Sequence, residues 1–260
     1  MKHKRLKNLF VGLVFLFLYL PIIILVIYSF NSSKVNILFE HFTFDWYKNL
    51  FSNIELLDAF SNTMIIAVVS TIISTIIGTL GAYGLNKYNF KFKGFINSLL
   101  YIPIVIPEIV LGISLLSIYT LMKLELGMFT LILSHIAFSI PFVIVSVRST
   151  LSSVIKTYEE VSYDLGASKF ATFYKVTLPL IMPGVVSGAT LAFTLSLDDV
   201  VISYFTAGPG SNTLPLKIYS MIKTGITPDV NALSTLMLIV TIIILSVSVI
   251  IQSRKVVSRG

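Results

Sequence analysis

Residues 159–179 read EEVSYDLGASKFATFYKVTLP, a polar-rich stretch that separates two strongly apolar ones. A helix is predicted over Lys156–Leu165, because Tyr158, Val161 and Leu165 repeat at the i, i+3 and i+7 spacing that places side chains on one helix face. This helix is short and amphipathic, so it has an apolar face to bury.

Gly166 follows this helix and provides a turn. A second short helix is predicted after it, and Leu178-Pro179 is expected to end that helix, because proline disfavours helical backbone in the residue before it. Three aromatic residues share one face of the second helix: Phe170, Phe173 and Tyr174. We call residues 155–179 the bracket and predict that it lies outside the bilayer. Amphipathicity alone is equally consistent with a loop that packs on its own protein.

The composition is that of an integral membrane protein. The 260 residues are 55% hydrophobic and 12% charged, with a mean hydropathy of +0.91, whereas soluble domains are about 25% charged. One polytopic domain over residues 1–260 accounts for the length. The chain has no cysteine, which excludes disulfides, thiolate metal sites and a cysteine nucleophile. In a membrane protein, a net charge of +7 reflects the basic residues placed in particular loops. We therefore expect no nucleic-acid partner.

Six apolar stretches predict an all-α fold with six transmembrane helices and the bracket between the fourth and the fifth. Each stretch is long enough to cross about 30 Å of hydrocarbon at 1.5 Å per residue. The first follows a basic segment, but it lacks a small-residue cleavage site and fits a spanning helix better than a signal peptide. The predicted spans are 8–30, 59–85, 95–122, 127–147, 181–207 and 231–251.

The loops differ in charge. Most of the 19 Lys and Arg residues fall in four segments on one side: the N-terminus, the 86–94 loop, the bracket and the C-terminus. Because basic residues accumulate on the cytoplasmic side of membrane proteins, both termini and the bracket are predicted to be cytoplasmic.

Three carboxylates, Glu108, Asp198 and Asp199, lie within the predicted spans, which contain no Lys or Arg. A charge inside a membrane is costly, so intramembrane acids usually face a cavity or pathway. The alternative for Glu108 is a protonated or hydrogen-bonded structural acid. Pro103 and Pro107 precede it and predict a kinked or locally open helix. Three acids without a basic counterpart favour a cationic solute over an anion.

Two further residues join the predicted pathway. Ser196 stands three residues before Asp199, so the two would share a helix face. Trp46 follows Asp45 in an aromatic external loop, where its ring would offer cation–π contact to a cation. An interfacial aromatic anchor is the alternative for Trp46. His135 is expected to be a hydrogen-bonded core histidine.

The bracket resembles the EAA loop of the permease subunits of ABC importers. The match rests on the spacing of an acid, a glycine and a hydrophobic-x-Leu-Pro ending: Glu160, Gly166-Ala167, Val176 and Leu178-Pro179. In that family this loop is the coupling helix that sits in a groove of the cytoplasmic ATPase. The resemblance therefore implies a coupling role for Glu160, Gly166 and Ala167. The chain departs from the family at Val161 and Ser162, where two alanines are usual.

Four longer stretches are similar to permeases of polyamine ABC importers, and the similarity covers nearly the whole chain. The stretches are PIIILVIYSFNSS (21–33), FTFDWY (42–47), LAFTLSLDDVVISYF (191–205) and LPLKIYSMIKTGITPDVNAL (214–233). The resemblance implies ATP-driven uptake of spermidine or putrescine across a bacterial inner membrane. It also implies a second related permease subunit, two copies of a cytoplasmic ATPase and an extracytoplasmic polyamine-binding protein. Glu108 departs from the aspartate expected in close relatives.

No catalytic centre is predicted. The chain lacks a Gly-x-x-x-x-Gly-Lys-Ser/Thr run, so ATP and Mg²⁺ are expected in the partner ATPase, with no cofactor or metal in this chain. An importer for another cationic or neutral solute remains an alternative. A proton-coupled secondary transporter that uses Glu108 and the aspartate pair is a second one. A membrane enzyme would need a His/Ser or His/metal constellation, which His135 alone does not provide.

Overall fold

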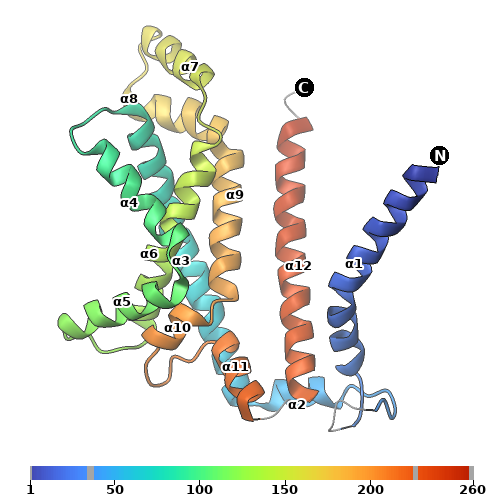
Figure 1. Ribbon diagram of the computed structural model, residues 1–260. Helices are drawn as coiled ribbons and strands as arrows, with labels where there is room; N and C mark the ends of the chain where they lie inside the picture. Colours follow the sequence, from blue (N-terminus) through green and yellow to red (C-terminus); the bar gives the residue numbers. More distant parts are fainter. Residues whose placement is uncertain (1, 34–37, 225–227, 258–260) are drawn as a thin grey trace. The chain divides into compact units, whose positions relative to one another are not determined.

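The computed structural model describes residues 2–33, 38–224 and 228–257, and within these the regular elements are helical (Figure 1). Lys34 and Arg259, which enter the charge asymmetry, lie outside the described residues. The chain divides into two compact units, residues 1–58 with 217–243 and residues 59–216 with 244–260. The helices in chain order are α1 (Lys2–Tyr28), α2 (Asp45–Ser52), α3 (Ile54–Lys87), α4 (Lys93–Val105), α5 (Glu108–Leu121), α6 (Met128–Arg148), α7 (Ser153–Asp164), α8 (Lys169–Thr172), the π-helix η1 (Phe173–Thr177), α9 (Leu178–Leu197), α10 (Val201–Thr206), α11 (Leu214–Thr224) and α12 (Pro228–Val257).

Five helical stretches in the described residues are long and apolar enough to cross a membrane: Lys7–Tyr28, Ile54–Lys87, Met128–Arg148, Lys169–Leu197 and Asp229–Val247. A sixth is obtained when the bent pair α4 and α5 is counted as one span. The predicted all-α polytopic fold is therefore confirmed.

Two predicted spans are not single helices. In the stretch 95–122, α4 and α5 are two helices whose directions differ by 113°, which is far more than a kink within one helix. Pro107 forces Ile106 into extended backbone at φ −71° and ψ 139°, because the proline ring disfavours helical conformation in the preceding residue. The stretch 181–207 also breaks, since α9 ends at Leu197 and α10 begins at Val201.

The bracket differs from its prediction at its second helix. Leu178-Pro179 does not end this helix, because α8 passes through η1 directly into α9. Pro179 falls in the first turn of α9, where a proline is tolerated, and the preceding π-helical turn widens the backbone there.

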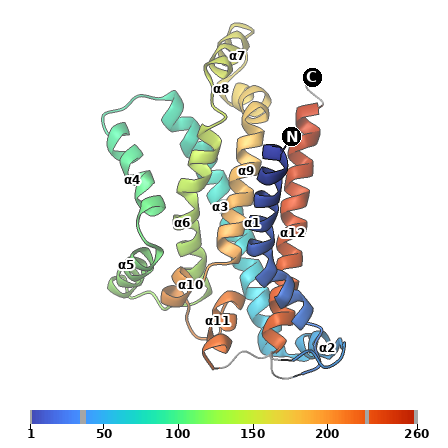
Figure 2. The same cartoon turned by 45° about the vertical axis from the view of Figure 1, so that its right-hand side comes forward.

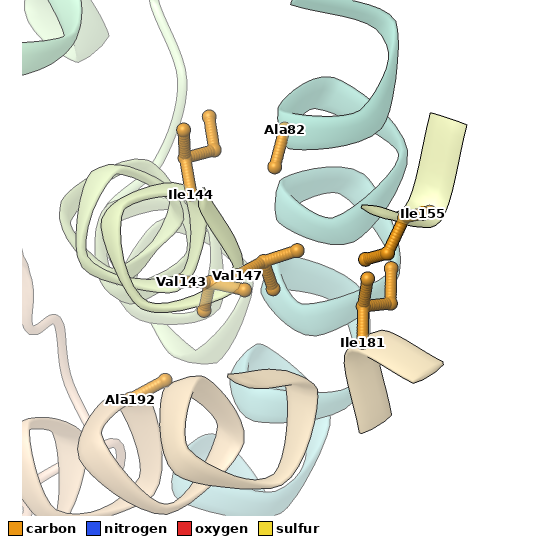
Figure 3. Packing of buried hydrophobic residues seen from close by; sticks show 7 residues of the cluster. All are labelled: Ala82, Val143, Ile144, Val147, Ile155, Ile181 and Ala192. Carbon is orange, nitrogen blue, oxygen red and sulfur yellow. The ribbon is translucent and has the colours of Figure 1, made fainter. Parts of the chain in front are cut away.

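The core of the second unit lies between α3, α6 and α9 and includes a residue of α7. Figure 3 shows its buried members, which are Ala82, Val143, Ile144, Val147, Ile155, Ile181 and Ala192. The helices approach closely at small residues: a Cβ on Gly78 would lie 2.6 Å from Val143 Cγ1, and one on Gly184 would lie 2.8 Å from the Ser146 carbonyl oxygen. Such close packing is how helices associate in lipid, where apolar side chains gain little by leaving the tails.

The second unit has two distinct ends. Figures 1 and 2 both show α7 and α8 at one end of α6 and α9, with α5 and α10 at the other. We call these the bracket end and the far end. At the far end α5 packs against α10, and a Cβ on Gly112 would lie 2.6 Å from Phe205 Cδ2. The two helix breaks therefore meet at the far end.

Candidate functional site

An acidic hollow of about 310 Å³ opens where the two broken helices meet. Glu108 enters it from the first turn of α5, and Asp198 and Asp199 enter it from the break between α9 and α10. Its lining residues are Glu108, Leu195, Asp198, Asp199, Val200 and Val201. The structure thus brings together the three acids that the sequence singled out, and no Lys or Arg is among the lining residues.

The two adjacent aspartates have different surroundings. Asp199 is 8% exposed, and its carboxylate accepts hydrogen bonds from Ile202 N at 3.1 Å, Ser203 N at 2.7 Å and Ser203 Oγ at 2.8 Å. It therefore satisfies the free backbone donors at the start of α10. Asp198 is exposed and follows the last residue of α9. Of the pair, Asp198 is the one whose carboxylate is open to the hollow.

Ser196 belongs to a buried polar network and not to the lining of the hollow. Its hydroxyl lies 2.6 Å from His135 Nδ1 and 3.2 Å from Ser70 Oγ. The other ring nitrogen, His135 Nε2, lies 3.2 Å from Ser203 Oγ and 3.5 Å from Asp199 Oδ2. The expectation of a hydrogen-bonded core histidine is confirmed. The expectation that Ser196 and Asp199 share a helix face is wrong, because α9 ends between them.

Sequence reasoning missed Ser70 and Ser203 as members of this network. The signal available was His135 itself, because a buried imidazole needs a partner at each ring nitrogen and serine is a frequent one in membrane helices. The network links α3, α6, α9 and α10. It consequently holds the break that presents Asp198.

Trp46 lies in the first unit, in the first turn of α2. Its indole Nε1 donates a hydrogen bond to the Asn31 carbonyl oxygen at 2.6 Å, and the side chain is partly buried. Phe30, Phe42, Phe44 and Tyr47 form a ring cluster beside it in the chain, with Phe30 and Phe42 stacked at 5.1 Å. The hydrogen bond fixes the edge of the indole.

The turn of the bracket depends on Gly166, whose φ is +82°. Gly166 N donates to Tyr163 O at 2.8 Å and Ala167 N donates to Ser162 O at 3.0 Å, which is the Schellman arrangement that closes a helix C-terminus. Ser168 Oγ then accepts from Ala171 N at 3.2 Å and begins α8. Ser162, where the family has alanine, has its hydroxyl 3.0 Å from that of Thr172. These hydrogen bonds end α7 and begin α8, so they set the reversal of the chain between the two helices.

Most of the apolar face predicted for the bracket is exposed in the described part of the chain. Phe170 and Tyr174 stack with ring centroids 6.4 Å apart. Phe173 differs, since it packs on Tyr83 of α3 with centroids 4.9 Å apart. Glu160 is also exposed, and its Oε1 lies 3.8 Å from Lys156 Nζ. The exposed apolar side chains are Tyr158, Val161, Leu165, Phe170 and Tyr174.

The neighbouring acid, Glu159, is the buried acid of the bracket, and sequence reasoning missed its burial. Its Oε2 lies 2.9 Å from Lys87 Nζ, and its Oε1 accepts a hydrogen bond from Thr177 Oγ1. Burial of this carboxyl opposes its ionisation, but the hydrogen bonds from Thr177 and Lys87 outweigh that effect and lower the pKa of Glu159. The signal for its burial was helical phase, because adjacent residues point about 100° apart.

Several apolar spans, an acidic hollow at broken helices and an exposed amphipathic bracket define a membrane permease subunit. Residues 74–259 match the model of the family "Binding-protein-dependent transport system inner membrane component", and the chain belongs to that family. It is 43% identical over 257 residues to the spermidine/putrescine transport system permease protein PotC of Shigella flexneri, covering 99% of this chain and 97% of that protein. It is 37% identical to the putrescine transport system permease protein PotI of Escherichia coli (strain K12), covering 86% and 82%.

Solved structures support the same fold. A bacterial ABC transporter for import of the acidic polysaccharide alginate contains a chain with a TM-score of 0.72 and 17% identity, with 94% of each chain covered. The MetNI methionine ABC transporter contains one with a TM-score of 0.61 and 18% identity, covering 77% of this chain and 94% of that one.

Proposed function

We propose that this chain is a permease subunit of an ATP-driven importer that moves polyamines, spermidine or putrescine, into the cytoplasm. The observation that carries the substrate class is the acidic hollow, which combines Glu108 and Asp198 with no basic lining residue. The relatives with 43% and 37% identity are permease proteins of spermidine/putrescine and putrescine transport systems, which supports the same class. An importer of another cationic solute is less supported.

The chemistry of the hollow suits a flexible cation with several amino groups. A multiply charged amine that leaves water must regain contacts with acceptors, and ionised carboxylates supply the strongest hydrogen bonds. Transport also requires release, so two or more spaced acids suit passage better than one deep trap. Asp198 and Glu108 contact the substrate in this scheme, and Asp199 with Ser196 holds the break in place. Trp46 offers a ring face to the cation at the external entrance.

The remaining subunits and the orientation are part of the proposal. A second, PotB-like permease subunit shares the pathway, two PotA-like ATPases bind and hydrolyse MgATP, and a PotD-like protein delivers the polyamine from outside. Both termini and the bracket lie on the cytoplasmic side of a bacterial inner membrane. The apolar face of the bracket, together with Glu160, docks into the ATPase. The exposure of Phe170 and Tyr174, at 79% and 62%, supports a docking surface that this chain does not cover by itself.

The test uses the complete complex in proteoliposomes with labelled spermidine outside and ATP inside. Asp198→Asn keeps the size of the side chain and removes its charge, so uptake is expected to fall at least about tenfold, in line with the loss of one charge-assisted contact. ATP hydrolysis in the absence of substrate should persist. Asp58→Asn, at an exposed position of α3, is the matched control and should leave uptake unchanged.

Near-normal spermidine uptake by an Asp198→Asn complex, at equal expression, would contradict the acidic pathway. Uptake that survives ATP depletion but stops with an uncoupler would instead favour a proton-coupled transporter. Competition by unlabelled putrescine, with lysine as the comparison cation, would separate polyamines from other cationic solutes.

A further inference from the structure

A buried polar cluster joins the bracket to two long helices of the second unit. Lys87 is the last residue of α3, and its ammonium donates to Tyr83 Oη at 2.5 Å, Tyr163 Oη at 2.7 Å and Glu159 Oε2 at 2.9 Å. Glu159, on α7, accepts a further hydrogen bond from Thr177. Thr177 is the last residue of η1 and directly precedes α9. We call Lys87, Glu159 and Thr177 the anchor.

Each side chain of the anchor has its hydrogen-bond partners, which for Lys87 include Tyr83 and Tyr163 outside the anchor. Lysine has three ammonium donors, and all three are used. The side chain of Glu159 is 8% exposed and that of Lys87 is 23% exposed, while Thr177 is fully buried. Removing one member would leave a buried charge or hydroxyl without its partner, which is far more costly than losing an exposed ion pair.

The next ion pair on α7 provides an internal contrast. Lys156 and Glu160 lie 3.8 Å apart within one helix, and their side chains are 80% and 62% exposed. Such a pair stabilises a helix slightly and joins nothing else. Glu159 instead connects three elements, α3, α7 and η1, the turn that leads directly into α9. The two adjacent glutamates thus face in different directions and connect to different neighbours.

We propose that the anchor is a mechanical joint that makes α7 move together with the bracket ends of α3 and α9. This inference rests on the proposed function, in which a partner ATPase displaces the bracket. An amphipathic helix held only by apolar contacts can slide on its support, because such contacts have no preferred direction. Charge-assisted hydrogen bonds at both sides of Glu159 fix its position. The displacement of α7 therefore reaches α9, whose opposite end presents Asp198 at the hollow.

The sharpest test alters only the Thr177 hydroxyl. Thr177→Val is close to isosteric and removes the hydrogen bond to Glu159, whereas Thr177→Ser retains it. Both complexes are reconstituted with their partners, and the ratio of polyamine imported to ATP hydrolysed is measured. We expect this ratio to fall about threefold or more in Thr177→Val and to stay near the wild-type value in Thr177→Ser. A purely structural role would lower complex yield and both rates together, leaving the ratio unchanged.

A double-mutant cycle then tests the ion pair. Lys87→Met and Glu159→Gln each remove one partner, and the double variant removes both. If the anchor acts as a unit, the fall in the ratio for the double variant is much smaller than the product of the two single effects. Lys93→Met is the control, because Lys93 lies outside the anchor and its side chain bonds only to Asn89 among the described contacts.

The outcomes separate the anchor from the proposed function. Wild-type complex that imports no polyamine on addition of ATP refutes the proposed function. Wild-type complex that imports polyamine, with unchanged ratios in Thr177→Val and in both ion-pair variants, refutes the anchor alone. Independent, multiplicative effects of Lys87→Met and Glu159→Gln also refute it.

Discussion

At the scale of single residues, neighbours of the same chemical type have different roles in this chain. Asp198 is open to the hollow, whereas Asp199 uses its carboxylate on the first turn of α10. Glu160 is exposed on the bracket, whereas Glu159, in the same helix, is buried. In both pairs a difference of one position decides whether an acid is left open to its surroundings or instead bonds within the fold.

The aspartate pair gives a prediction about stability. Asp199→Asn is expected to destabilise the purified complex by about 1–3 kcal/mol, because an amide replaces a carboxylate that accepts three hydrogen bonds. Asp198→Asn should leave the unfolding temperature unchanged. Thermal unfolding in detergent, monitored by the fluorescence of an added dye, measures the difference. Equal unfolding temperatures for the two variants would show that Asp199 is no structural cap.

At the scale of elements, the sequence predicted the helical content and the two parts of the bracket but not every helix end. Pro107 marked the break before Glu108 because proline acts on its own neighbours. The break after Leu197 has no proline or glycine to mark it. It forms because the side chain of Asp199 competes for backbone donors that an unbroken helix would use. Hydrophobic periodicity does not report such local competition, so the separate roles of Asp198 and Asp199 emerged only from the structure.

Gly166 gives a prediction about the bracket as an element. Its φ of +82° is costly for any side chain with a Cβ, while open space surrounds the position. Gly166→Val should therefore misalign α8 through backbone strain alone, and substrate-stimulated ATP hydrolysis should fall while membrane insertion persists. Gly166→Asn is the control, because asparagine tolerates left-handed backbone, and it should retain more coupling. Normal coupling in Gly166→Val would exclude a role for this turn.

At the scale of the whole molecule, charge asymmetry predicts the orientation in the membrane. The chain has no cysteine, so single cysteines introduced at exposed positions can report their side by labelling. Ser168→Cys, in the bracket, should react with an impermeant maleimide only in inside-out vesicles. Asp45→Cys, at the exposed first residue of α2, should react in intact cells. Labelling of both from the same side would contradict the predicted orientation.

The π-helical turn η1 determines how this part of the chain responds to the loss of a residue. It holds more residues per turn than the α-helices on either side, and it connects α8 to α9 without an intervening loop. One turn of π-helix contains about one residue more than one turn of α-helix, so deleting one residue between 173 and 177 would restore an ordinary α-helical turn and leave the direction in which α8 faces nearly unchanged. Phe170 would then keep its direction, whereas deleting one residue from the regular α-helix that follows would turn it by about 100°. The turn η1 can therefore absorb the loss of one residue, and the phase of the bracket depends on the number of residues in α9 beyond it.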